Sequence, residues 1–175
     1  MKILGLLRHA KSDWGHSDKR DFDRGLNARG HRGARVIGEH IREHGVQWDR
    51  LIASPAERVR LTLAEALPDI EPAWDERLYL AGTDTIMDLL REKGGSAGAV
   101  LLAGHNPGLG DMLFELVAPK NENALYDEAK VKFPTAAFAV YELDIADWSD
   151  LHDGCAKLVH FARPRDLDAE LGPEY

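Results

Sequence analysis

The chain has 175 residues and a formal net charge of −8, and 44% of its residues are hydrophobic and 30% charged. This composition is typical of one soluble globular domain, and the sequence contains neither the Lys/Arg run of a nucleic-acid-binding face nor the ~20-residue apolar run of a membrane span. Cys155 is the only cysteine, which excludes an intrachain disulfide and argues against a cysteine-based zinc site. The N-terminal apolar stretch is too short for a signal peptide. We therefore expect a cytoplasmic protein that binds neither nucleic acid nor membrane.

Three short apolar runs organise the sequence, over residues 3–7, 51–53 and 99–103. Continuous apolar runs bounded by turn residues are typical of buried strands in a parallel sheet that helices cover on both faces. We therefore expect an α/β fold, a three-layer α/β/α sandwich with a mostly parallel central sheet. Residues 1–163 should form this single domain, and residues 164–175, which are rich in acids, should form a solvated C-terminal tail.

Arg8 and His9 directly follow the first apolar run. A neutral imidazole nitrogen can attack phosphorus and form a covalent phosphohistidine. A neighbouring guanidinium disfavours protonation of the ring and binds phosphoryl oxygens bidentately. Taken alone, the two residues also fit a plain surface pair.

The second apolar run is followed by a candidate helix start. Ser54 and Glu57 have the spacing of a capping box, and the proline between them suits the first position of a helix. A helix N-terminus favours an anion, and Arg58 adds positive charge to the first turn. The alternative is a solvent-facing arginine; Arg60, two residues further on, should face elsewhere.

His105 follows the third apolar run, between Gly104 and Gly108. These glycines let the backbone approach a ligand closely, and a histidine between them can donate a hydrogen bond to a phosphoryl oxygen on which charge develops. The alternative is a helix cap at Asn106 beside an incidental histidine. Because ligands bind at the carboxyl ends of parallel strands, the three strand ends together predict a phosphoryl-transfer enzyme.

The residues at these strand ends resemble a known family. Residues 7–10 (Leu-Arg-His-Ala), 54–58 (Ser-Pro-Ala-Glu-Arg) and 104–105 (Gly-His) resemble the signatures of the histidine phosphatase (phosphoglycerate mutase-like) superfamily. Ala10 stands where the superfamily signature has glycine. Residues 8–14 and 132–135 look most like the SixA-type phosphohistidine phosphatase branch, and the resemblance runs from about residue 3 to residue 161.

This resemblance assigns roles to the residues singled out above. It implies that His9 is the phosphorylated nucleophile and that Arg8, Arg58 and His105 form the phosphate pocket. Glu76 lies in a segment similar to the one that carries the proton-donating glutamate of the mutases. Glu76 is therefore the candidate acid or base, with an ordinary surface acid as the alternative.

The remaining polar candidates are weaker. Ser12 adds a further phosphate donor or is simply solvated. His40 and His44 have the i, i+4 spacing of a metal site on a helix, but the sequence offers no third ligand nearby, so we expect a solvated face there and at His160. We expect no metal and no cofactor, because cationic side chains neutralise the phosphate.

The substrate follows from the size of the chain. A short chain leaves little room for a lid over a small substrate, so we expect phosphohistidine on a partner protein, such as a histidine phosphotransfer domain. The alternatives are a phosphatase or mutase of a small phosphorylated metabolite and a phosphate-binding module without catalysis. Binding alone does not require a nucleophile, so the presence of both His9 and His105 argues against the module.

Overall fold

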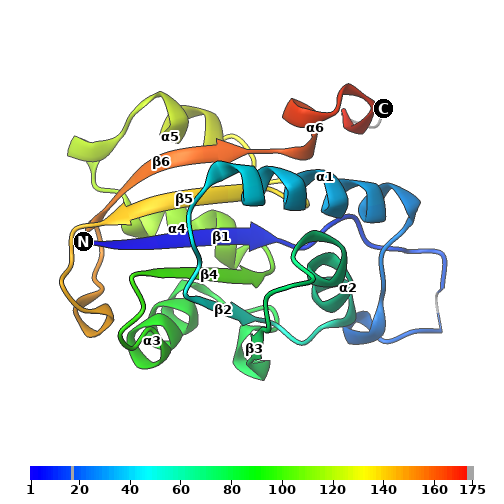
Figure 1. The fold of residues 1–175 in the computed structure, drawn as a ribbon, viewed down its shortest axis with the longest axis horizontal. Coiled ribbons are helices and arrows are strands. Elements are labelled where there is room, and N and C mark those ends of the chain that lie inside the picture. Colours follow the sequence, from blue (N-terminus) through cyan, green and yellow to red (C-terminus); the bar gives the residue numbers. More distant parts are fainter. Residues whose placement is uncertain (17, 173–175) are drawn as a thin grey trace.

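A six-stranded sheet forms the centre of the protein (Figure 1). The computed structural model describes residues 1–16 and 18–172. In chain order the strands are β1 (Lys2–Arg8), β2 (Arg50–Ala53), β3 (Ala73–Trp74), β4 (Ala99–Gly104), β5 (Phe138–Leu143) and β6 (Ala156–Ala162). Their order across the sheet is β3-β2-β4-β1-β5-β6, and β5 alone runs against the others. The predicted mostly parallel sheet is confirmed, and the three apolar runs form its central strands.

The described part of the chain contains six α-helices, of which α1 has both a side-chain cap and a glycine stop. They are α1 (Ala28–His44), α2 (Glu57–Ala66), α3 (Thr83–Lys93), α4 (Gly108–Leu116), α5 (Ala124–Ala129) and α6 (Pro164–Leu167). The Asn27 side chain caps α1 by accepting from the backbone N–H of Gly30 at 2.7 Å, and Gly45 ends this helix in the left-handed region with φ 91°. None of the described helices is long and apolar enough to cross a bilayer.

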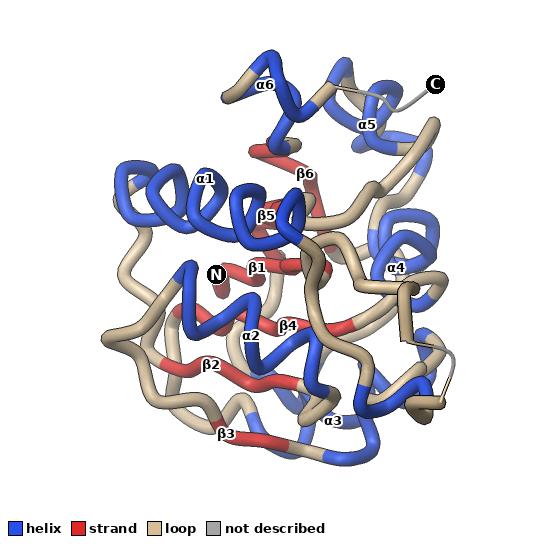
Figure 2. Tube along the Cα trace, turned by 90° about the vertical axis from the view of Figure 1, so that its right-hand side faces the viewer, coloured by secondary structure: helices blue, strands red, loops and turns tan. Residues whose placement is uncertain are grey.

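Two hydrophobic cores, one on each face of the sheet, define the layers. Apolar residues of α1 and α2 pack on one face, and those of α3, α4 and α5 pack on the other. Figure 2 shows α1 and α4 on opposite sides of β1 and β5. On the α1 side, Gly5 lets Trp48 lie against β1, because a Cβ at Gly5 would stand 2.5 Å from the Trp48 ring. The predicted three-layer sandwich is confirmed.

Residues 164–172, the described part of the expected tail, contact the domain although five of them are exposed. Pro164 is buried, α6 follows β6 directly, and Arg32 of α1 forms ion pairs with Asp168 and Glu170, both at 2.6 Å. Asp168 and Glu170 therefore pair with Arg32 of α1 and anchor this segment to the domain. Residues 173–175 lie outside the described part of the chain.

Candidate active site

Backbone hydrogen bonds to β4 carry the sheet one residue past β1 and one residue past β2, and so fix the candidate residues at one edge. The His9 N–H donates to the carbonyl of Gly104 at 3.1 Å, and the Ser54 N–H donates to that of Ala103 at 3.1 Å. The next residues, Ala10 and His105, therefore leave adjacent strands at the same level. The parallel order β2-β4-β1 brings the three predicted strand ends together.

His9 has the tautomer that a nucleophile needs. Its Nδ1 lies 2.7 Å from the carbonyl oxygen of Ala10, which can only accept, so Nδ1 holds the proton of the neutral ring and Nε2 keeps its lone pair. Burial, with the nearby guanidinium groups of Arg8 and Arg58 adding to it, lowers the pKa of His9 to about 3. The ring is therefore neutral at physiological pH.

His105 lies beside this ring, with 5.3 Å between the two ring centroids. Its Nε2 is 2.7 Å from the hydroxyl of Ser54. Burial and the charge of Arg58 lower the pKa of His105 to about 4. When the Ser54 hydroxyl donates to Nε2, the proton of the neutral ring is on Nδ1, where it can be donated to a ligand.

The contact between Ser54 and His105 corrects the predicted capping box. Helix α2 begins at Glu57 with Ala56 as its N-cap, and no side chain caps it. The Ser54 hydroxyl turns instead to His105, a partner that a local sequence pattern does not reveal. Arg58 nevertheless lies in the first turn of α2, as predicted.

Two residues that the sequence patterns missed surround Arg58. Asp21, in the short 3-10 helix η1 (Asp21–Asp23), accepts from Arg58 through its backbone carbonyl at 2.8 Å and through its carboxylate at 3.1 Å. The Tyr79 hydroxyl donates to the same carboxylate, and this hydrogen bond, together with Arg58, lowers the pKa of Asp21. The Tyr79 ring meets the His105 ring edge-on at 5.5 Å. Tyr79 directly follows the 3-10 helix that begins at Glu76, and no local sequence pattern pointed to its contact with Asp21.

Arg8 completes the positive wall of the site. One guanidinium nitrogen donates to the carbonyl of Phe133 at 3.2 Å, and burial and the charge of Arg58 lower the pKa of Arg8. Arg8 Nε and His105 Nδ1 are buried and have no hydrogen-bond partner among the described residues. Buried polar atoms without partners destabilise a fold unless a ligand satisfies them, and an oxyanion is a ligand of the type that accepts from such donors.

Thr62 of α2 connects the loop that follows His9 to Arg58. Its hydroxyl accepts from the N–H of Ala10 at 2.9 Å and donates to the carbonyl of Arg58 at 2.6 Å. The loop after β1 is thereby fastened to the first turn of α2. A neutral imidazole, two guanidinium groups and a second imidazole thus converge in a buried site whose chemistry suits a phosphoryl group.

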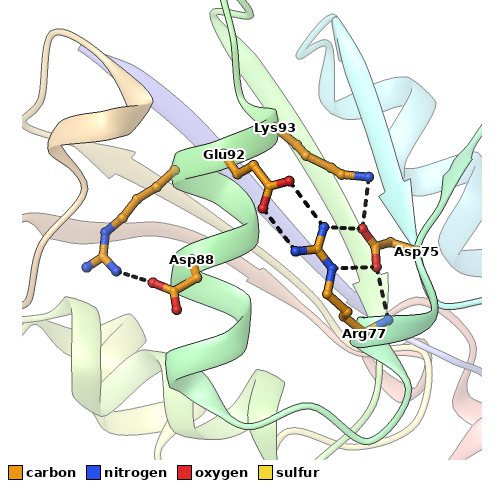
Figure 3. Close-up of polar contacts among 6 residues, drawn as sticks. Asp75, Arg77, Asp88, Glu92 and Lys93 are labelled. Carbon is orange, nitrogen blue, oxygen red and sulfur yellow. Dashed lines mark hydrogen bonds and ion pairs between the residues drawn. The ribbon is translucent and has the colours of Figure 1, made fainter.

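Glu76 and Ser12 lie outside this cluster of contacts. Glu76 is exposed at the start of the 3-10 helix η2 (Glu76–Leu78). Figure 3 shows the neighbouring network, in which Arg77 lies between Asp75 and Glu92 and Lys93 meets Asp75 at 2.8 Å. Ser12 is buried, and its backbone forms a bridge to Leu26. No hydrogen bond or ring contact joins Glu76 or Ser12 to His9 in the described part of the chain.

The structure corrects the expectation of a solvated face at His40 and His44. Strand β6 brings His160 beside them, with its Nε2 2.8 Å from that of His40 and its ring centroid 4.3 Å from that of His44. Burial and the two neighbouring rings lower the pKa of His160 to about 4. Among residues 1–16 and 18–172, no group of three His, Cys, Asp or Glu side chains has an arrangement that could hold a metal ion.

Comparisons with known proteins agree with this geometry. The model of the histidine phosphatase superfamily (branch 1) matches residues 4–80. An uncharacterized protein of Mycobacterium tuberculosis is 34% identical over 160 residues, which are 91% of this chain and 100% of the relative.

Solved structures also match almost the whole chain. One, a SixA protein of Nakamurella multipartitia named as a candidate phosphohistidine phosphatase, has 32% identity and a TM-score of 0.82 over 93% of this chain and 96% of its own. A protein of the same description from Agrobacterium tumefaciens has 29% identity and a TM-score of 0.75 over 93% of this chain and 98% of its own. The chain therefore belongs to the histidine phosphatase superfamily, in its SixA-type branch of phosphatases.

Proposed function

We propose that this protein hydrolyses phosphohistidine on a partner protein through a covalent intermediate on His9. The observation that carries the proposal is the state of the His9 ring, neutral at physiological pH and held by the Ala10 carbonyl so that Nε2 has the lone pair. A nucleophile of this kind divides a difficult hydrolysis into two easier displacements.

In the first displacement, the lone pair of His9 Nε2 forms a bond to phosphorus while the P–N bond of the substrate breaks. The electron pair of that bond leaves with the substrate imidazole, which departs as a neutral ring when its other nitrogen carries a proton. Arg8, Arg58 and His105 hold the phosphoryl oxygens, and these cationic and donor groups stabilise the charge that spreads over the oxygens in the transition state.

In the second displacement, a water oxygen attacks the phosphorus of phospho-His9 and the P–Nε2 bond breaks. The pair of electrons returns to Nε2, inorganic phosphate leaves, and the proton of the water passes to a base or to solvent. Glu76 is the proposed acid or base of this cycle, and the Asp21 carboxylate, which accepts from Arg58, is the alternative. A phosphoramidate whose leaving ring is already protonated requires little general acid.

Two observations support phosphohistidine as the substrate. Two SixA proteins that match almost the whole chain are named as candidate phosphohistidine phosphatases. In addition, a chain of 175 residues leaves little sequence for a lid that would enclose a small metabolite.

The experiment compares phosphate release from two classes of substrate. A phosphorylated histidine-carrier domain should lose phosphate much faster with this protein than with its H9N variant, while sugar and glycerate phosphates should react slowly. Use of the metabolites alone would reject phosphohistidine as the substrate.

A second measurement tests the intermediate. The protein is first mixed with a radioactive phosphoryl donor, and the reaction is then stopped rapidly without acid. Label that is stable to base and labile to acid should be found on the peptide that contains His9. Turnover without such label on that peptide would contradict covalent catalysis by this ring.

A further inference from the structure

Asp21 holds the guanidinium of Arg58 at two points. The backbone carbonyl of Asp21 accepts from Nη1 at 2.8 Å, and one carboxylate oxygen, Oδ2, accepts from Nη2 at 3.1 Å. Contacts to two different nitrogens fix both the position and the plane of a guanidinium, whereas one contact leaves it able to turn about that hydrogen bond. A guanidinium has five N–H bonds, so this grip leaves others that can donate to phosphoryl oxygens.

Tyr79 holds the carboxylate in place. Its hydroxyl donates to the same Oδ2 that accepts from Arg58. Its ring meets the Phe22 ring of η1 edge-on, with 5.0 Å between the two centroids, and it also meets the His105 ring edge-on. Tyr79 therefore contacts both η1, which carries Asp21, and the second imidazole of the site.

Burial and charge suit this contact to orienting Arg58. The Arg58 side chain is 6% exposed and that of Asp21 is 43% exposed, so the guanidinium is the buried member of the pair. The Tyr79 hydrogen bond and Arg58 hold the pKa of Asp21 below its usual range against the opposing effect of burial, so the carboxylate remains charged. A carboxylate with a lowered pKa is a weak proton acceptor, which favours a fixed anion over an acid or base.

The backbone next to Tyr79 is strained. Leu80 has φ 53°, in the left-handed region that bulky residues rarely adopt. Its side chain is 53% exposed, so its burial offsets little of this strain. Strained backbone of this kind clusters at active sites, which agrees with a functional requirement on the place of Tyr79.

We propose that Asp21 is a positioning residue that, held by Tyr79, keeps the Arg58 guanidinium in the orientation in which it binds the transferring phosphoryl group. This inference rests on the role of Arg58 in the proposed function, and it gives Asp21 a role other than proton transfer. An acid or base acts through its own proton, whereas a positioning residue acts only through the residue that it orients. A double-mutant cycle distinguishes the two roles.

The cycle compares the kcat of wild type, D21A, R58A and D21A/R58A with a phosphorylated histidine-carrier domain and with para-nitrophenyl phosphate. D21A should lower kcat about tenfold, because misplacing a binding group is costly although the backbone carbonyl keeps one of the two contacts. In the R58A background, D21A should cause no further loss, because no guanidinium remains to be oriented. A further tenfold loss there, or an unchanged kcat in D21A, would overturn the positioning role.

The matched control is D23A. Asp23 is an exposed carboxylate of the same 3-10 helix, and it forms its ion pair with Arg20 at 2.8 Å. D23A makes the same change in charge as D21A and should keep the wild-type kcat. Equal losses of kcat in D21A and D23A would show that the effect comes from the charge or folding of η1 and would overturn the contact with Arg58 as its cause.

The D21N variant separates positioning from proton transfer and preserves the shape of the side chain. Its amide oxygen can accept from Arg58 and Tyr79 in the place of Oδ2. D21N should therefore lose less kcat than D21A, and its profile of kcat against pH should keep the wild-type shape. Loss of one limb of that profile in D21N would assign proton transfer to Asp21 and overturn the inference.

A measurement on Arg58 itself requires no turnover and separates this inference from the proposed function. The NMR signal of the Arg58 Nε–H, identified by its absence from R58A, should have an order parameter of roughly 0.85 in wild type and D23A and of roughly 0.6 or less in D21A. If no phosphohistidine protein is hydrolysed but D21A loosens Arg58, the proposed function fails and the positioning contact stands. If Arg58 is as ordered in D21A as in wild type, the positioning role is refuted for any substrate.

Discussion

The depressed pKa of His9 makes a quantitative prediction about stability in acid. In the unfolded chain a histidine titrates near 6.5, whereas burial lowers the pKa of His9 in the folded protein to about 3. Between these values the unfolded chain binds a proton that the folded protein does not. The contribution of this ring to stability is therefore fully present above pH 6.5 and is lost as the pH falls.

The magnitude follows from the distance between pH 5.0 and the unfolded pKa. At pH 5.0 that distance is about 1.5 pH units, and each unit corresponds to about 1.36 kcal/mol. Protonation of the unfolded His9 therefore lowers the free energy of unfolding by about 2 kcal/mol relative to pH 7.5.

The assay is urea unfolding of wild type and the H9N variant at pH 7.5 and pH 5.0. Other groups, such as His105, contribute equally to both proteins and cancel in the comparison. The H9N variant should lose about 2 kcal/mol less than wild type between the two pH values. The control H152N, which changes an exposed ring, should lose as much as wild type. Losses for wild type and H9N that agree within about 0.5 kcal/mol would refute the depressed pKa.

Three further predictions concern the phosphate site and its support. The R58A variant should lower turnover by roughly 10²–10³, as the loss of one transition-state donor does. The control R60A, which changes an exposed neighbour on α2, should keep wild-type kcat. Similar losses of kcat in both variants would contradict the placement of Arg58. Inorganic phosphate at 100 times its Kd should raise the free energy of unfolding of wild type by about 2.7 kcal/mol, and the same concentration should stabilise R58A less in the same urea titration. The G30A variant should be destabilised by about 1–3 kcal/mol or more, because its Cβ would lie 2.1 Å from the backbone oxygen of Lys11. In the control G33A, the nearest atom to the added Cβ is 3.9 Å away. This control should unfold at or above the wild-type urea midpoint.

Local patterns were sufficient for the parts of the fold and site that depend on neighbours in sequence. The three apolar runs became the central strands because residues buried on both faces leave a continuous apolar signal. Arg8, His9 and His105 came together because each follows one of those strands, and strand ends in a parallel sheet share an edge. Arg58 followed from its place in the first turn of α2.

Other features depend on which segments meet, and no local pattern records that. The Ser54 hydroxyl had a plausible local role as a helix cap, and only the adjacency of β2 and β4 offered it His105 instead. Asp21 lies 37 positions before Arg58, and the hydrogen bonds between them come from the packing of η1 against α2. His160 joined His40 only because β6 lies beside β5 under α1.

The sequence by itself therefore determined the fold class, the strand ends and the four polar side chains that gather there. The tertiary structure decided the tautomer of His9 and the partners of His105 and Arg58. Secondary structure and strand burial follow from the local periodicity of the chain. Hydrogen bonds and charge clusters between distant segments depend instead on the global arrangement, in which each polar group takes the partner that packing brings within reach.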